Sequence, residues 1–254
     1  MRFLLFFCVL FHCNFLKAEV YDCFTFFNEL ELLRLRFEEL YNVVDRFVIV
    51  ESPISYTGKE KPLYYRENAH LFQQFQDKVI HIVVDSFPGL TDDEEKNHWA
   101  REAYSRNAIS LGLQNCKDND VIFISDLDEI PRAETIREVQ DYLARFADIP
   151  ERRRAKLNDS DLVCGLDMRL FMYSMNRENP KGWYGGSKGA PYWIVQKHTP
   201  WGIKLFHHKY AMHKIPNAGW HFNTMGGKEK SLYKWLHTGP IYFPGLEKAL
   251  LELG

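Results

Sequence analysis

The feature that most constrains the fold is an alternation of short apolar runs with helical patterns between residues 20 and 125. The runs predict strands at 20–26, 45–51, 78–84 and 120–125, and helical spacing predicts helices at 28–41, 68–76 and 93–113. Strands that are apolar on both faces are typical of a parallel sheet covered by helices. The sequence therefore predicts an α/β domain, with its ligand at the carboxyl ends of the strands.

The pattern becomes irregular after about residue 150. Strands are predicted at 162–173 and 192–196 and short helices at 228–236 and 245–253, separated by loops rich in Gly, Pro, Trp and His. Residues 170–254 carry 11 Lys and Arg against 4 Asp and Glu, although the whole chain has a net charge of −2. We expect a single domain over residues 19–254, with this basic part folded over the active face near an anionic ligand. No nucleic-acid motif occurs, so a nucleic-acid partner is not expected.

Residues 1–18 form a separate unit in the sequence. Met1-Arg2 is followed by an apolar run that is shorter than the roughly 20 residues of a membrane span. The pattern is typical of a signal peptide or a short N-terminal anchor. A signal peptide or an anchor predicts an exported or membrane-associated protein. If the segment has neither role, a cytoplasmic protein is expected. The cysteines beyond it, Cys23, Cys116 and Cys164, lack metal-site spacing and are expected to be free thiols.

The clearest chemical signal is a pair of carboxylates directly after the fourth apolar run. Asp126 and Asp128 are separated by one residue, so their side chains share one side of an extended backbone. Carboxylate oxygens suit Mg²⁺ or Mn²⁺, which also bind substrate phosphates. Glu129 points to the other side and is expected to make a structural bond. An acidic turn that caps the next helix is the alternative role for this segment.

Two other functional classes share part of this pattern. A phosphatase of the D-x-D type places its motif after the first strand and needs a later Lys and a paired acid, whereas the acidic pair here lies beyond residue 120. A non-catalytic carbohydrate-binding module would use the abundant aromatic residues, which make up 15% of the chain, but needs no paired carboxylates.

Several segments together resemble glycosyltransferase family 17 over most of residues 20–238. The matching segments are 21–29, 43–52, 61–64, 126–131 and 219–221. The compact chain is more similar to bacterial members than to Golgi ones. The resemblance implies a GT-A-type fold and an inverting transfer of N-acetylglucosamine from UDP-N-acetylglucosamine to a glycan acceptor. In the eukaryotic members the acceptor is a mannose of an N-glycan, linked β-1,4.

The resemblance also implies a set of metal ligands and a base. Asp126 and Asp128 match the metal-binding acidic motif, so Mn²⁺ or Mg²⁺ is the expected cofactor. His221, in a Gly-Trp-His segment, is a further expected ligand, and Trp220 is expected either to stack on a sugar or to pack in the core. Glu229 matches a family acid and is the predicted catalytic base.

Three further residues are expected to contact the donor, and two alternatives to the base stay open. Glu51 ends the second predicted strand, where GT-A enzymes contact the nucleoside. Arg106, with Asn107 beside it, presents a guanidinium suited to a diphosphate, although it could pair with a local acid on its helix. The alternative bases are Asp167 and Glu178, because acids are scarce in the C-terminal part. The segment 182–189 is predicted to be an aromatic loop that closes over the donor or is an exposed turn.

Overall fold

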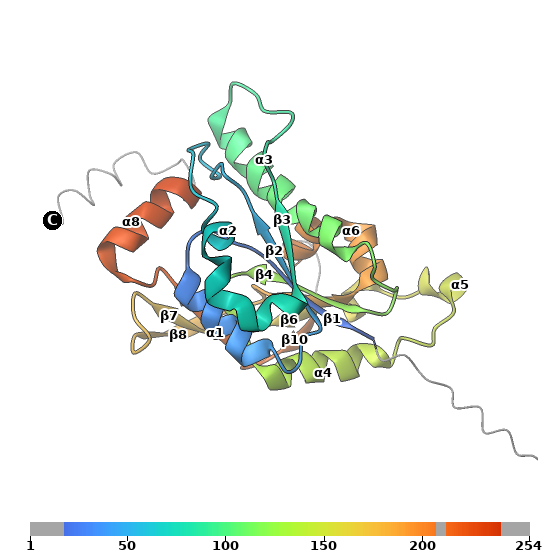
Figure 1. The fold of residues 1–254 in the computed structure, drawn as a ribbon. Helices are drawn as coiled ribbons and strands as arrows, with labels where there is room; N and C mark the ends of the chain where they lie inside the picture. Colours follow the sequence, from blue (N-terminus) through green and yellow to red (C-terminus); the bar gives the residue numbers. More distant parts are fainter. Residues whose placement is uncertain (1–17, 207–211, 240–254) are drawn as a thin grey trace, which may run out of the picture.

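The computed structural model describes residues 18–206 and 212–239. Within these ranges, seven strands form a sheet in the order β10-β6-β9-β4-β1-β2-β3 (Figure 1). Their bounds are β1 Val20–Thr25, β2 Arg46–Glu51, β3 Val79–Val83, β4 Val121–Asp126, β6 Cys164–Leu166, β9 Lys188–Pro191 and β10 His213–Ile215. Only β9 runs antiparallel to its neighbours, β4 and β6. The expected mostly parallel sheet is therefore confirmed.

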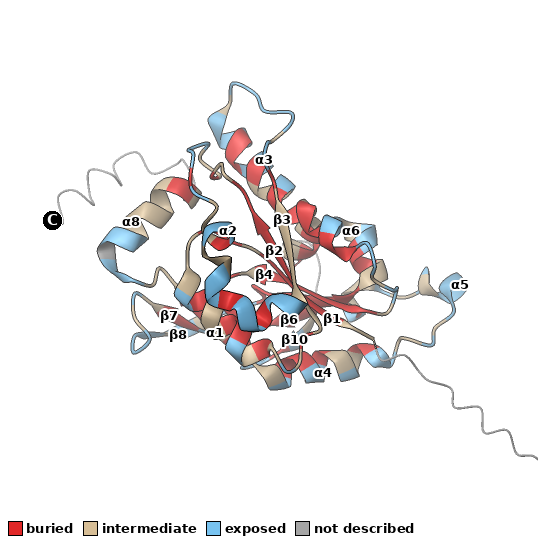
Figure 2. Cartoon of the chain, in the orientation of Figure 1, coloured by how far each residue is buried: buried red, intermediate tan, exposed pale blue. Residues whose placement is uncertain are grey.

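Helices cover both faces of this sheet (Figure 2). One face carries α1 (Leu30–Leu40), α2 (Tyr64–Asn68), the 3₁₀ segment η1 (Ala69–Lys78) and α4 (Ala133–Ala144); the other carries α3 (Glu94–Asn107), the 3₁₀ segment η2 (Ala108–Leu113) and α6 (Tyr192–Lys204). In β2, Phe47 and Ile49 belong to the first core, whereas Val48 and Val50 belong to the second. Successive side chains of a strand alternate between faces, which is why the run had to be apolar throughout.

A second, smaller sheet lies beyond the carboxyl end of β4. Its order is β5-β11-β7-β8, with bounds β5 Glu129–Pro131, β7 Met168–Met172, β8 Glu178–Trp183 and β11 Gly219–Asn223. Because β5 begins three residues after β4 ends, the two sheets meet at the acidic segment. Helix α8 (Gly227–Thr238) lies beside the same edge in Figure 1, so the C-terminal part covers the active face as expected. The short segments α5 (Glu151–Arg154) and η3 (Asp159–Asp161) connect α4 to β6.

The structure corrects two expected strands. The segment 192–196 is the start of α6, and the strand is β9 just before it. The aromatic and β-branched residues suggested a strand, but Pro191 ends β9 at the position before the first helical turn. The segment 162–173 is divided between β6 and β7, which belong to different sheets.

Other expectations from the sequence have mixed outcomes. Cys23 and Cys164 are buried free thiols and Cys116 is a half-buried one. The segment 182–189 is the end of β8 and the start of β9 rather than one loop. The predicted leader at 1–18 lies almost wholly outside the described residues, and the predicted helix at 245–253 lies wholly outside them. Within the described part of the chain, no helix combines the length and apolar character needed to cross a membrane.

Candidate active site

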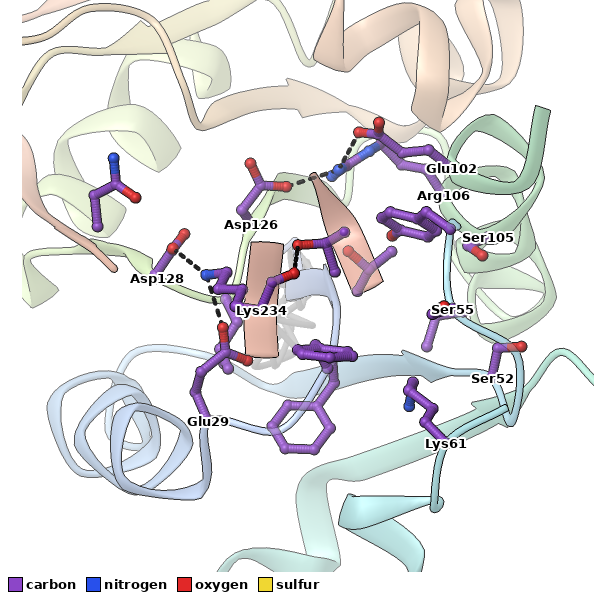
Figure 3. Close-up of a pocket in the computed structure, with 18 of the residues that line it drawn as sticks. Glu29, Ser52, Ser55, Lys61, Glu102, Ser105, Arg106, Asp126, Asp128 and Lys234 are labelled. Atoms are coloured by element: carbon purple, nitrogen blue, oxygen red, sulfur yellow. Dashed lines mark hydrogen bonds and ion pairs between the residues drawn. The ribbon is translucent and has the colours of Figure 1, made fainter. Parts of the chain in front are cut away.

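A cavity of about 340 Å³ lies at the carboxyl ends of β1, β2 and β4 (Figure 3). The segments after these strands, together with α3, the small sheet and α8, contribute its walls. Polar and aromatic lining residues include Thr25, Phe27, Glu29, Ser52, Ser55, Tyr56, Lys61, Glu102, Ser105, Arg106, Asp126, Asp128, Trp183, His221, Asn223 and Lys234. The cavity therefore occupies the position that the strand pattern predicted for a ligand.

Asp126, the last residue of β4, is held between two cations. Its Oδ1 accepts a hydrogen bond from Arg106 Nη2 at 2.7 Å, and its Oδ2 lies 2.9 Å from Lys204 Nζ. Burial opposes the charged form, but Lys204 and Arg106 hold the pKa of Asp126 well below its usual range. The guanidinium of Arg106 also lies 3.3 Å from Glu102, which lines the same wall. The pairing with a local acid on its helix is thus present, the ion pair with Asp126 was not expected, and the contact with a diphosphate stays a prediction.

Asp128, in the connection between β4 and β5, also has basic partners. Its Oδ2 accepts a hydrogen bond from Lys234 Nζ at 2.9 Å, and its Oδ1 lies 3.6 Å from His221 Nε2. Although the carboxylate is buried, Lys234 and His221 lower the pKa of Asp128. The pairing of β11 with β5 brings His221 opposite Glu129 and so beside the acidic segment. The structure thus gathers Asp126, Asp128, His221 and Arg106 around one cavity.

Glu129 makes the structural bonds that its position suggested. Its carboxylate is buried and accepts hydrogen bonds from Trp183 Nε1 at 2.8 Å and Ser187 Oγ at 3.1 Å. Its Oε2 also lies 2.9 Å from Lys204 Nζ, the same ammonium that contacts Asp126. Glu129 therefore links the aromatic edge of the cavity to the carboxylate at its centre.

Arg36 fixes the backbone of the acidic segment, a role that the sequence did not reveal. From α1 it donates to the carbonyls of Asp126 and Leu127 at 3.0 Å and of Glu129 at 2.9 Å. It also forms a fully buried ion pair with Asp22, whose Oδ1 lies 2.6 Å from Arg36 Nη2. The one signal in the sequence was Asp22, an acid within an otherwise apolar strand.

The structure does not bring Glu51 and Asn107 to the cavity. Glu51 is buried, and its carboxylate accepts a hydrogen bond from the Tyr65 backbone N–H at 2.8 Å and lies 3.1 Å from His81 Nε2. The carboxylate therefore holds the start of α2 against β2 rather than facing a ligand. Asn107 accepts a hydrogen bond from the backbone N–H of Trp201 at 3.0 Å and joins α3 to α6.

Trp220 and Glu229 also lie outside the cavity lining. Trp220 is half-buried, packs against the hydrophobic core, and has the guanidinium of Arg132 4.2 Å from its ring centre. This is the core-packing role that was one of its two expected roles. Glu229 is exposed in the first turn of α8, so its role as a base stays a prediction. The alternatives Asp167 and Glu178 do not line the cavity either.

Three lysines, two beside the acidic pair and one in the cavity lining, were not identified from the sequence. Lys204 comes from the last turn of α6, Lys234 from α8, and Lys61 from the segment between β2 and α2. The basic C-terminal part indicated that cations would approach the site, but no local pattern distinguishes these lysines from the others. Lys61 is buried, which lowers its pKa, and its ammonium lies 5.5 Å from the ring centre of Phe27.

The chemistry of the donor atoms fits a divalent cation. The two carboxylates suit Mn²⁺ and Mg²⁺, and the imidazole of His221 suits Mn²⁺ better than the harder Mg²⁺. The buried Nδ1 of His221 has no hydrogen-bond partner in the described part of the molecule. In the arrangement seen, however, the described residues contain no group of three His, Cys, Asp or Glu side chains close enough to hold a metal. A cation would therefore have to replace Lys234 at Asp128.

Comparisons with known proteins agree on the type of protein. The sequence model of glycosyltransferase family 17 matches residues 7–224. The human β-1,4-mannosyl-glycoprotein 4-β-N-acetylglucosaminyltransferase and its rat counterpart are each 36% identical over 108 residues, which cover 41% of this chain and 20% of the relative. The match thus spans far less than the full length of these curated relatives.

Solved structures resemble the fold more distantly. Glucosyl-3-phosphoglycerate synthase from Mycobacterium tuberculosis matches with a TM-score of 0.38 and 10% identity, over 80% of this chain and 72% of that one. A second mycobacterial protein matches with a TM-score of 0.40 and 10% identity, over 80% of this chain and 66% of that one.

Proposed function

The chain belongs to glycosyltransferase family 17, and from that premise we propose that it transfers N-acetylglucosamine from UDP-N-acetylglucosamine to a glycan acceptor, with inversion at the anomeric carbon. The observation that carries the proposal is the placement of Asp126 and Asp128 in the wall of a cavity at the carboxyl end of β4. The seven-stranded sheet with its single antiparallel strand agrees with the GT-A class that the family implies.

The two ends of the cavity suit different parts of the donor. Just after β1 and β2, the cavity lining includes the ring of Phe27 and the hydroxyls of Ser52 and Ser55. Hydroxyls and an aromatic face are suited to a nucleoside, which has a flat base and a polar ribose. The nucleoside is therefore assigned to this end and the diphosphate to the acidic segment, where Arg106 keeps Asp126 ionised and oriented.

Asp126, Asp128 and His221 are the proposed ligands of Mn²⁺ or Mg²⁺. A bound cation supplies Lewis-acid stabilisation of the charge that develops on the departing diphosphate. Arg36 holds the backbone on both sides of Asp128 through the carbonyls of Leu127 and Glu129, and Glu129 keeps Lys204 beside Asp126. The protein thus fixes the two carboxylates before any ligand arrives, and such preorganisation is a main source of electrostatic catalysis.

The acceptor is proposed to be a glycan with a terminal or branching mannose, as the names of the human and rat relatives indicate for those proteins. Inversion requires a base that removes the proton from the attacking hydroxyl. Glu229 remains the proposed base, because it matches an acid of the family.

The N-terminal segment 1–18 remains a proposed export signal or anchor. A chain starting at Glu19 is therefore expected to be soluble and active. Insolubility of that chain beside a soluble full-length chain would contradict this.

The test of the function is a donor screen in the presence and absence of Mn²⁺, with released nucleoside diphosphate as the readout. We expect release from UDP-N-acetylglucosamine, loss of release in EDTA and recovery with Mn²⁺. Asp128→Asn is expected to weaken donor binding and to slow release by about 100- to 1000-fold. Asp118→Asn is the matched control, because Asp118 pairs with Arg154 at the surface.

The outcomes separate the two alternative classes. Release of inorganic phosphate from phosphomonoesters, without use of a nucleotide sugar, would indicate the phosphatase. Glycan binding without any diphosphate release would indicate a carbohydrate-binding module. Full release in EDTA would contradict the role given to the cation.

A further inference from the structure

We propose that Trp183 and Tyr184, at the end of β8, form the platform on which a sugar ring of the acceptor glycan stacks. The inference rests on the proposed function and identifies the acceptor subsite of the same cavity. It concerns residues of the aromatic segment 182–189, which the sequence analysis expected either to close over the donor or to be an exposed turn.

The position of the platform follows from the two ends of the cavity. Ser52 and Ser55, just after β2, line the end assigned to the nucleoside, whereas Trp183, His221 and Asn223 come from the small sheet. With the nucleotide at the first end, an acceptor has to approach the acidic segment from the second. Figure 2 shows the β7–β8 hairpin at the surface of the molecule, with exposed residues at its turn.

Trp183 is held rigidly although its side chain is partly open to solvent. Its Nε1 donates to the buried Glu129 at 2.8 Å, and its ring centre lies 4.5 Å from that of His221. A Cβ atom on Gly186 would stand 2.0 Å from Trp183 Nε1 and 2.3 Å from Glu129 Oε1, so only glycine allows this contact. The indole therefore has a fixed orientation beside His221, as a binding platform requires.

Tyr184 directly follows Trp183 in the chain. It is 65% exposed, and the backbone on either side takes a left-handed conformation at Gly182 (φ 67°) and Gly185 (φ 62°). Those two glycines allow the backbone to bend on both sides of the two consecutive aromatic residues. Trp183 and Tyr184 are both exposed and adjacent in the chain, and a contiguous exposed apolar patch is typical of a binding surface.

Comparison with the other exposed aromatics singles out this pair. Within the described residues, the aromatics classed as exposed are Trp99, Tyr104, Tyr173, Trp183 and Tyr184. Only Trp183 among them lines the cavity, and Tyr184 is its neighbour in the chain. A pyranose ring has an apolar face that stacks on an aromatic ring and hydroxyls that need polar partners; Asn223, in the same cavity wall, offers an amide for them.

The test compares Tyr184→Ala and Trp183→Phe with Trp99→Ala and Tyr104→Ala, which remove exposed aromatics from α3. We expect Tyr184→Ala to raise the KM for a mannose-containing oligosaccharide about tenfold, which corresponds to about 1.4 kcal/mol. Affinity for UDP-N-acetylglucosamine and its hydrolysis without acceptor should stay at the wild-type level. Trp183→Phe keeps an aromatic ring but loses the hydrogen bond to Glu129, so a smaller rise in the acceptor KM is expected. The two α3 variants should not change the acceptor KM.

A direct binding measurement distinguishes failure of this inference from failure of the proposed function. Saturation-transfer NMR of the oligosaccharide with the full chain, without donor, should show contact that Tyr184→Ala weakens and Tyr104→Ala does not. An unchanged acceptor KM and unchanged NMR contact in Tyr184→Ala would overturn the platform. If wild type neither binds nor hydrolyses the donor but its glycan contact depends on Tyr184, the transferase proposal fails and the platform stands. Absence of glycan contact in the wild-type protein overturns the platform as well.

Discussion

Lys234 places its ammonium 2.9 Å from Asp128 Oδ2 and 2.7 Å from Glu29 Oε1, and so ties α8 to the acidic segment and to the start of α1 (Figure 3). Burial alone would lower the pKa of Lys234, but Asp128 and Glu29 raise it, so the ammonium stays charged. One consequence is that Asp128 already has a cationic partner supplied by the protein. A divalent cation that binds Asp128 has to compete with this lysine.

Lys234→Met is therefore expected to strengthen binding of Mn²⁺ by about tenfold, or about 1.4 kcal/mol. Methionine keeps the apolar stem but removes the competing charge. Titration of free Mn²⁺ by electron paramagnetic resonance measures the affinity without requiring turnover.

The control for this prediction is Lys230→Met on the same helix. Lys230 pairs with Glu31 at the surface, and both side chains are largely exposed. Its replacement is expected to leave Mn²⁺ affinity unchanged. Equal or weaker Mn²⁺ binding in Lys234→Met would show that the lysine and the cation do not share Asp128.

Strands β1 to β4 of the main sheet could be predicted because their signal is local, whereas the short strands β9 and β10 were missed. Residues 46–51 are apolar or strand-forming at nearly every position, and a run buried on both faces leaves few alternatives. The small sheet had no such signal. Its strands are short, and β5 joins β11 about 90 residues further along the chain, a pairing that no local pattern encodes.

In the candidate site, too, some residues could be predicted from the sequence and others could not. Asp126 and Asp128 were predictable because they follow a strand directly, and His221 because it matches a segment of the family. Lys204 and Lys234 were not, since their relation to the aspartates arises only when α6 and α8 pack against the sheet ends. Glu51 was expected to contact the donor because it ends a strand. Its carboxylate instead accepts a hydrogen bond from the backbone at the start of α2.

Arg36→Leu is expected to destabilise the fold by about 3–5 kcal/mol, because Asp22 would remain buried without its partner. Urea denaturation measures the loss. Arg34→Leu, at a half-buried position on the same helix where the guanidinium donates to a backbone carbonyl, is the control and should cost less. The double variant Arg36→Leu/Asp22→Leu should recover part of the stability, but not the support of the acidic segment. No loss in Arg36→Leu would contradict the buried ion pair.

The buried ammonium of Lys188 leads us to expect that the free energy of unfolding depends on pH. Its ammonium is buried in β9 and donates to the carbonyls of Gly185 and Gly186, and burial lowers the pKa of Lys188 to about 7. In the unfolded chain lysine keeps its proton to about pH 10.4. The unfolded state therefore binds more protons between these values, and the free energy of unfolding rises with pH there.

The comparison is between wild type and Lys188→Met at pH 6.5 and pH 9. The stability of wild type relative to the variant should increase from the lower to the higher pH, as measured by urea denaturation. A constant difference across this range would show that Lys188 keeps its usual pKa in the folded protein.

The last prediction concerns the base. If Glu229 accepts the proton of the acceptor hydroxyl, Glu229→Gln should lower transfer by about 100-fold or more, while affinity for the donor and for Mn²⁺ stays at the wild-type level. The amide keeps the shape of the side chain but cannot take up the proton. Single-turnover transfer measures the first quantity and calorimetry the second.

Glu178→Gln is the matched comparison, because Glu178 is also exposed, lies outside the cavity lining and was an alternative base. Loss of transfer in Glu229→Gln but not in Glu178→Gln would require α8 to carry Glu229 to the acceptor during turnover. Retention of transfer in both variants would remove Glu229 and Glu178 from the role. The base would then have to be sought among the carboxylates that line the cavity, where Glu102 is a carboxyl whose pKa burial raises.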